Sequence, residues 1–103
     1  MKTHGHITGF PEISKQEWNQ IIADLALNSV TTAEITNPMT GDKVEIQSPP
    51  NQIAEFQPVN GNGGGVIRLC VFGDDIDFEG TGEEFQKIID NVCSRLMATI
   101  DYF

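Results

Sequence analysis

Hydrophobic residues recur at the three- and four-residue spacing of a helix in two stretches of the chain. The first stretch follows Ser14, and Glu17 three residues later completes a capping box, in which each side chain bonds an amide at the helix start. Ile13 and Trp18 stand where a hydrophobic staple closes over such a start. We expect this helix to end near Asn28, with an apolar stripe made of Trp18, Ile21, Ile22 and Leu25.

The second helical stretch lies near the C-terminal end and is longer. Thr81 and Glu84 repeat the capping-box spacing, so we expect the helix to begin there. Cys93 falls on the edge of its apolar stripe, which consists of Phe85, Ile88, Ile89, Val92, Leu96 and Ile100.

Between these helices the hydrophobic period falls to two, which is the period of a half-buried strand. Residues 32–36 and 43–47 flank a segment, 37–42, whose Pro and Gly favour a tight reversal, and they predict a hairpin. Residues 48–51 contain two prolines and predict a further turn, whereas the glycine-rich residues 60–65 predict a connection between strands.

Four further segments have the character of strands. Residues 53–59 alternate in polarity, residues 66–72 are apolar enough for the middle of a sheet, and residues 4–9 and 75–79 are shorter. The order β-α-β-β-β-β-(β)-α predicts one α+β domain over residues 1–103, with an antiparallel sheet of about five strands. We expect both helices to pack on one face of this sheet and the other face to be open to solvent or to a partner.

The charge of the chain limits the classes of partner that we expect it to bind. Fifteen acidic residues against six basic ones give a formal net charge of −9. Such a surface repels phosphate backbones and anionic lipid headgroups, so we expect no nucleic-acid and no membrane partner. It attracts a basic protein. No apolar run approaches the ~20 residues that cross a bilayer, and Cys70 and Cys93 lie in apolar patterns, so we expect a cytoplasmic chain with free thiols.

One acidic segment approaches a metal motif. Asp75, Asp77 and Glu79 match the first three ligand positions of a calcium-binding EF-hand loop, and Gly80 matches its sharp turn. The twelfth position, however, is Gln86 instead of a bidentate glutamate. The alternating hydrophobic residues between the acids are typical of a strand, so we interpret these acids as its exposed side.

The other candidate metal, phosphate-binding and catalytic sites have even less support in the sequence. His4 and His6 would lie on one side of a strand, but the nearby sequence offers no third ligand, so we expect solvated histidines, no metal and no cofactor. The glycine run precedes a strand and lacks the lysine of a phosphate-binding loop, so we interpret it as an adaptable connection. No nucleophile stands beside a base, so we expect no enzyme unless the fold brings His4 or His6 beside a group of acids.

These observations predict a non-catalytic protein-binding module that masks a basic protein partner through its helix-free sheet face. The profile of size, charge and missing catalytic motif is similar to that of the small acidic immunity proteins of bacterial toxin systems, a resemblance that assigns no residues. One alternative is a small-ligand or cation sensor that uses Asp75, Asp77 and Glu79, and another is a structural or assembly subunit, including a homodimer. The candidate partner-binding residues are Glu34, Glu45, Glu55, Asp74, Asp75, Asp77 and Glu79.

Overall fold

The structure is a computed structural model that describes residues 2–37, 39–47, 52–58 and 63–103. Its elements follow in chain order as β1 (Lys2–Thr8), α1 (Lys15–Asp24), β2 (Asn28–Val30), β3 (Thr32–Thr36), β4 (Lys43–Gln47), β5 (Gln52–Phe56), β6 (Gly64–Leu69), β7 (Ile76–Thr81), α2 (Glu83–Leu96) and β8 (Thr99–Tyr102).

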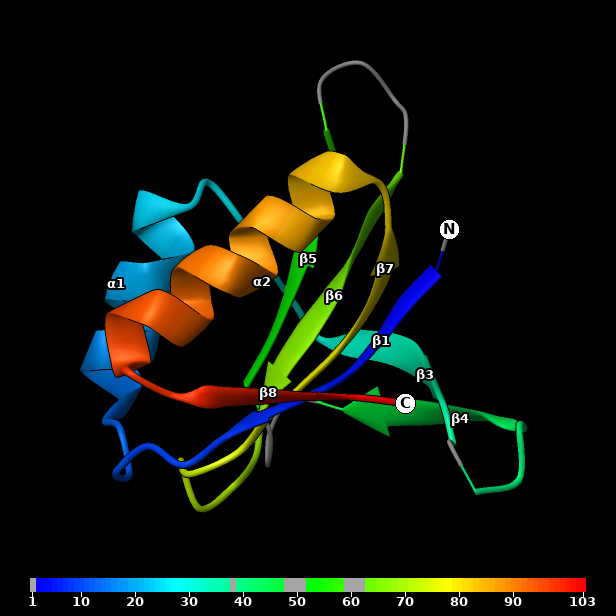
Figure 1. Cartoon of the computed structure of the whole chain (residues 1–103), viewed down its shortest axis with the longest axis horizontal. Coiled ribbons are helices and arrows are strands. Elements are labelled where there is room, and N and C mark those ends of the chain that lie inside the picture. Colours follow the sequence, from blue (N-terminus) through cyan, green and yellow to red (C-terminus); the bar gives the residue numbers. More distant parts are fainter. Residues whose placement is uncertain (1, 38, 48–51, 59–62) are drawn as a thin grey trace.

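Six strands form one antiparallel sheet in the order β2-β5-β6-β7-β1-β8, and both helices lie on one face of it (Figure 1). The α+β class predicted from the sequence is therefore confirmed. The predicted hairpin is also confirmed with its bounds, but β3 and β4 form a separate two-stranded sheet. The predicted turn at 48–51 and the first half of the predicted glycine-rich connection, residues 60–62, lie outside the described residues. The second half of this prediction is wrong in part, because Gly64 and Gly65 belong to β6.

The core fills the space between the large sheet and the two helices. Alternate residues of β1, β6 and β7 point toward the helices because successive side chains of a strand face opposite sides. They are Ile7, Ile67, Leu69, Ile76 and Phe78, and each is nearly inaccessible to solvent. The helices contribute Trp18, Ile21, Ile22, Phe85, Ile88, Ile89 and Val92 to the same cluster.

The start of α1 follows the sequence prediction, whereas its end does not. The amide of Glu17 donates to Oγ of Ser14 over 3.1 Å, and Ile13 and Trp18 are both buried. The helix ends at Asp24 with Leu25 as its C-cap, four residues before the predicted end at Asn28. Asn28 instead begins β2, a three-residue edge strand that its hydrophobic pattern does not reveal.

The predicted capping box at the start of α2 is wrong. Thr81 is the last residue of β7, where it pairs with Gly64, so it cannot act as a cap. The N-cap is Gly82, at φ 95°, without a side-chain hydrogen bond. Gly65 and Gly80 pair across β6 and β7 under this end of the helix, and an added Cβ on either would lie 2.6 Å from the ring of Phe85. The missing side chains let α2 lie close to the sheet.

The far end of α2 also departs from the prediction. The helix ends at Leu96, and Met97 adopts the left-handed conformation at φ 53°. The chain then enters β8, in which Ile100 pairs with Ile7 of β1. Ile100 is therefore a strand residue, although its spacing continues the helical stripe.

The β6 strand lies inside the sheet, as its apolar sequence predicts, but it is shorter than the predicted range 66–72. It ends at Leu69, and a turn follows in which the amide of Gly73 donates to the carbonyl of Cys70 over 3.0 Å. Cys70 thus lies just outside the strand. Cys70 and Cys93 are both half-buried free thiols. In the part of the chain that the structure describes, no helix has the length and apolarity needed to span a membrane.

The β3–β4 hairpin lies against the face of the sheet that the helices leave open, which we call the open face (Figure 1). Thr36 fixes it there, because its amide donates to Oε2 of Glu79 over 2.6 Å and its hydroxyl donates to Oε1 over 2.8 Å. Ile53 is buried although it alternates with Ala54 and so faces away from the helices. The open face is therefore partly covered by the chain itself.

Candidate functional site

The strand register aligns a row of polar side chains across the open face. Arg68 of β6 lies opposite Asp77 of β7, Asp77 lies opposite His6 of β1, and His6 lies opposite Asp101 of β8. These residues alternate along their strands with the hydrophobic residues of the core, so their side chains share the face that the helices do not cover. The fold brings together four polar residues that are far apart in the sequence.

His6 is the centre of this row. Its Nδ1 lies 3.5 Å from Oδ1 of Asp75, and its Nε2 lies 3.4 Å from Oδ2 of Asp101. The guanidinium of Arg68 contacts Oδ2 of Asp77. The prediction that the histidines are solvated and lack a neighbouring third ligand is therefore wrong for His6, whose side chain is 28 % exposed. The acids come from β7 and β8, which the local sequence around His6 cannot show.

His4 has different surroundings from His6, although both imidazoles point to the same face as predicted. Its ring stacks edge-on against Phe103, with the ring centroids 5.1 Å apart. Its cross-strand partner is Glu79, whose carboxylate bonds to Thr36 of the hairpin. Phe103 also contacts His6, with the ring centroids 5.2 Å apart, so the two histidines share this neighbour, whereas the contacts with Asp75 and Asp101 belong to His6.

The three acids of the EF-hand-like segment lie on one side of a strand, as the sequence predicts. Asp77 and Glu79 belong to β7, and Asp75 directly precedes it. The structure gives the three acids separate neighbours: Asp75 faces His6, Asp77 contacts Arg68, and Glu79 holds the hairpin. In the described parts of the chain, no loop wraps around these acids as an EF-hand loop would.

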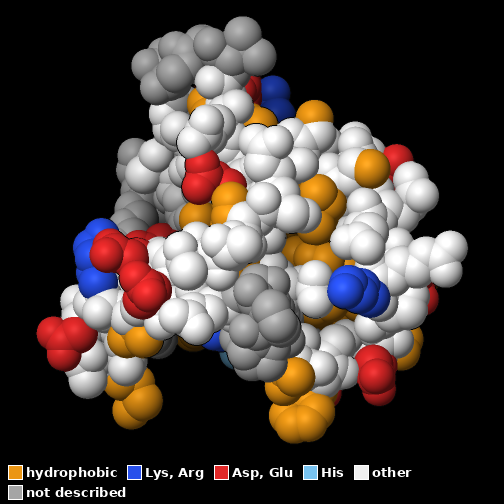
Figure 2. All heavy atoms as spheres, turned by 180° about the vertical axis from the view of Figure 1, so that it is seen from behind, with side chains coloured by type: hydrophobic (Ala, Val, Ile, Leu, Met, Phe, Trp, Pro, Cys, Tyr) orange, Lys and Arg blue, Asp and Glu red, His pale blue; other side chains and the backbone are white. Residues whose placement is uncertain are grey.

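The other four candidate acids lie apart from that row. Glu34 and Glu45 are directly opposite each other across the hairpin, and both are exposed. Glu55 of β5 accepts a hydrogen bond from the side-chain amide of Gln57. Asp74 accepts one from the thiol of Cys70 over 3.2 Å. Seen from behind the view of Figure 1, acidic side chains gather on the side of the molecule where the hairpin lies (Figure 2).

A groove of about 240 Å³ separates the hairpin from the open face. The hairpin contributes mainly apolar walls, whereas the sheet and the C-terminus contribute polar and aromatic ones. The lining residues are His4, Ile35, Asn37, Val44, Ile46, Arg68, Asp77 and Phe103. The sequence gives no signal for this groove, because nothing in it shows that the hairpin folds back onto the sheet.

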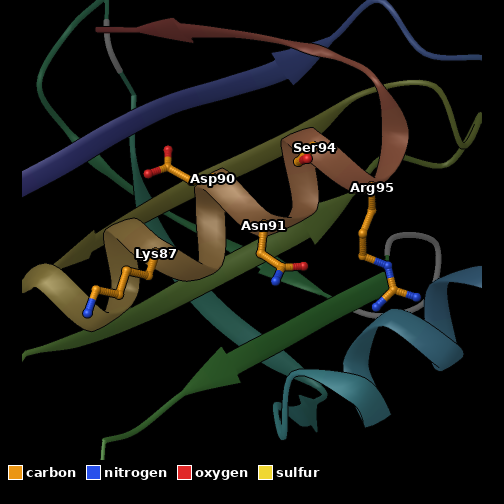
Figure 3. A pocket seen from close by; sticks show the side chains of 5 residues that line it. All are labelled: Lys87, Asp90, Asn91, Ser94 and Arg95. Atoms are coloured by element: carbon orange, nitrogen blue, oxygen red, sulfur yellow. The ribbon is translucent and has the colours of Figure 1, made fainter.

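A second hollow, of about 470 Å³, runs along the outer side of α2. Lys87, Asn91 and Arg95 point to one side of the helix, whereas Asp90 and Ser94 point to the other (Figure 3). Its polar groups do not converge on one point.

Arg95 is already engaged at one end of this hollow, because it reaches Asp24 of α1 over 2.9 Å. A hydrogen bond from Gln20, together with one from Arg95, lowers the pKa of Asp24. We therefore interpret the hollow as an open helix surface and Arg95 as a link between α1 and α2.

Comparisons of the chain with protein-family models, with curated proteins and with solved structures give no match. Its chemistry must therefore be argued from the geometry alone. The condition that we set for an enzyme is met in part, because His6 lies beside acids. Among the described residues, however, no serine, threonine or cysteine side chain hydrogen-bonds to His6, as an activated nucleophile would.

Proposed function

We propose that the chain is a non-catalytic protein-binding module that docks a basic segment of a protein partner on the acidic side of its β3–β4 hairpin. The observation that carries this proposal is the direct opposition of Glu34 and Glu45. Both side chains are exposed, and neither makes a hydrogen bond or an ion pair within the described part of the chain.

Two like charges directly opposite each other on one side of a strand pair destabilise that pair. A lysine or arginine side chain from a partner would lie between the two carboxylates and remove this cost. Arginine suits the position best, because its planar guanidinium can bond two carboxylates at once. The net charge of −9 would further accelerate the approach of a basic protein.

We leave two of the candidate acids out of the proposed docking surface. Asp77 and Glu79 already have partners inside the molecule, Arg68 and Thr36, and so contribute to the fold. We therefore centre the docking surface on Glu34 and Glu45. An inhibitor of this kind would mask a basic toxin or nuclease, as the resemblance to immunity proteins implies.

Affinity capture from the native host lysate tests this proposal when three forms of the protein are compared. They are the wild type, Glu34→Gln with Glu45→Gln, and a control, Glu12→Gln with Glu84→Gln, which removes the same charge from exposed sites elsewhere. We expect one basic protein to be retained at low salt by the wild type and the control, and to be lost from the hairpin variant.

The captured protein is then purified, and its Kd is measured against all three forms. We expect the hairpin variant to bind about tenfold more weakly, because it loses charge-assisted contacts of ~1.4 kcal/mol. The control should stay within about twofold, because long-range attraction alone is screened by salt. Equal weakening in both variants, or an empty capture, would contradict docking at the hairpin.

A further inference from the structure

We infer that His6, Asp75 and Asp77 form a binding site for one divalent transition-metal cation of the zinc type, with Asp101 holding the imidazole in position. This inference is independent of the proposed docking surface, because it uses neither Glu34 nor Glu45. It also differs from the calcium hypothesis derived from the sequence, because it replaces Glu79 by His6.

The ligand atoms are close enough to meet one ion. His6, Asp75 and Asp77 each present one such atom, and these atoms all lie within 4.8 Å of one another. Neighbouring ligand atoms of a tetrahedral zinc ion, each about 2 Å from the metal, are separated by about 3.3 Å. Small side-chain rotations would therefore suffice to close the site around an ion.

The backbone fixes the ligands to one place. His6 and Asp77 are direct partners in the pairing of β1 with β7, and Asp75 lies two residues before Asp77 on the same side. The site therefore depends on the register of two neighbouring strands inside the sheet. Glu79 cannot complete it in the same way, because its two oxygens accept the bonds from Thr36.

The second nitrogen of His6 has a partner of the kind that metal-bound histidines require. Nε2 faces Oδ2 of Asp101 at 3.4 Å, while Nδ1 faces Asp75. Metal-ligating histidines usually donate their other ring N–H to a carboxylate, which fixes the tautomer and raises the basicity of the ligating nitrogen. Asp101 is thus a positioning residue that directs the Nδ1 lone pair toward the site.

An unsatisfied oxygen marks the position of the ion. Oδ1 of Asp75 is enclosed by the protein, and among the described residues it has no hydrogen-bond partner. Nδ1 of His6 lies 3.5 Å from it. With the proton of His6 on Nε2, these two atoms are both acceptors, and a cation between them would serve both. An enclosed acceptor without a partner is costly, so the free protein retains an energetic reason to bind one.

The charge balance and the donor set select the class of cation. Asp75, Asp77 and Asp101 carry three negative charges, and Arg68 carries one positive charge beside them. The remaining two negative charges match a divalent ion. Arg68 contacts Oδ2 of Asp77, and the carboxylate of Asp77 also offers one oxygen to the group of ligand atoms. An imidazole with carboxylates suits zinc, nickel or iron, whereas calcium and magnesium prefer oxygen ligands alone.

Isothermal titration of the tag-free protein with Zn²⁺, and separately with Ca²⁺, tests the inference. We expect one zinc ion per chain and much weaker calcium binding. His6→Gln should weaken zinc binding at least tenfold, because it removes the imidazole ligand. His4→Gln is the matched control, since His4 lies on the same strand and the same face but does not belong to the group of His6, Asp75 and Asp77. The zinc affinity of this variant should stay within about twofold.

Two further variants separate the roles of the acids. Asp101→Asn should weaken zinc binding about tenfold, the usual effect of losing the outer partner of a ligating histidine. Asp75→Asn removes a ligand without altering β1, so it keeps the test decisive if His6→Gln fails to fold. Melting curves without metal check the folding of each variant. Zinc should raise the melting temperatures of the wild type and of His4→Gln by about the same amount, and those of the His6, Asp75 and Asp101 variants by less.

Three results would overturn the site. One is the absence of zinc binding by the wild type at millimolar concentration. Another is equal loss in the His4 and His6 variants, which would assign the ion to the His-Gly-His segment itself. The third is unchanged binding in the Asp75 variant. The variant Glu34→Gln with Glu45→Gln should bind zinc like the wild type, so failure of the metal site and failure of the docking surface are told apart.

Discussion

The two faces of the six-stranded sheet are built by different rules. On the helix-covered face, hydrophobic side chains and the glycine pair Gly65–Gly80 fit the surface of α1 and α2. On the open face, polar side chains are paired across neighbouring strands, as in the row from Arg68 to Asp101. The helix-covered face is thus specified by the fit of its side chains, and the open face by the pairing of polar side chains across strands. A substitution that disturbs only one of these two features tests it.

The largest effect is expected on the helix-covered face at Phe85, whose ring lies over the glycine pair. Phe85→Ala should lower the free energy of unfolding by about 3–5 kcal/mol, because it leaves a cavity in a fully buried site. Urea unfolding measures this loss. A loss below about 1 kcal/mol would mean that α2 does not depend on the fit of this ring.

Gly80→Ala tests the same contact between α2 and the sheet, because the added methyl group would lie 2.6 Å from the ring of Phe85. We expect a loss of about 1–3 kcal/mol in the wild type. In the Phe85→Ala background the loss should shrink, because the ring that the methyl group meets is gone. Equal losses in both backgrounds would show that backbone contacts, and not the ring, exclude a side chain at this position.

On the open face, Arg68→Met should lower the free energy of unfolding by less than Phe85→Ala does. Methionine keeps most of the apolar stem but leaves the half-buried carboxylate of Asp77 without its partner. We expect a loss of about 1–3 kcal/mol, the usual cost of removing a hydrogen bond to a charged group. Adding Asp77→Asn should recover part of this lost stability, because the unpaired charge is removed. A double variant less stable than Arg68→Met would contradict a stabilising pair of Arg68 and Asp77.

A substitution that loosens the hairpin from the sheet is expected to have a smaller effect on stability than Arg68→Met. Thr36→Val removes the hydroxyl that donates to Glu79 but keeps the backbone amide that donates to the same carboxylate. We expect a loss of about 1 kcal/mol, seen as faster amide hydrogen exchange in β3 and β4. Unchanged exchange there, with unchanged overall stability, would show that the hydroxyl does not hold the hairpin.

The smallest effect is expected between the helices, at Asp24. The hydrogen bonds from Gln20 and from Arg95 lower the pKa of this exposed carboxyl group. Because the lowered pKa belongs to the folded state, its stabilising effect is present above the ordinary pKa of aspartate and is lost as the pH falls through the lowered value. Arg95→Gln should therefore raise the pKa of Asp24 part of the way back, as an NMR titration would show. An unchanged pKa would assign the whole effect to Gln20.

The sequence predicts those features that depend on neighbours along the chain. The N-cap at Ser14, the bounds of the hairpin and the alternation around Ile76 and Phe78 are local, and all three are confirmed. The other half of the predicted capping box differs, because the Glu17 carboxylate accepts from the Ser14 hydroxyl. The helix start at Thr81 was predicted wrongly, because strand pairing with β6 outweighs the local capping signal.

The candidate site could be predicted only in part for the same reason. Asp75 and Asp77 were identified from their spacing, but Asp101 and Arg68 enter through strands whose order no local pattern shows. The strand that carries Asp101 is four residues long and continues a helical stripe in sequence, so it was assigned to α2. The sequence also does not show that His6 is their neighbour, because this depends on the position of β1 between β7 and β8.

The proposed docking of a basic partner requires that the opposed carboxylates of Glu34 and Glu45 repel each other in the free protein. The most direct test is the opening free energy of the β3 and β4 amides, measured by hydrogen exchange in Glu45→Lys and in the wild type at low salt. Lysine opposite Glu34 would replace repulsion by attraction. We therefore predict that the hairpin becomes more stable by about 0.2–1 kcal/mol. An unchanged or less stable hairpin would contradict the claim, because the glutamate pair would then carry no cost for a partner to relieve.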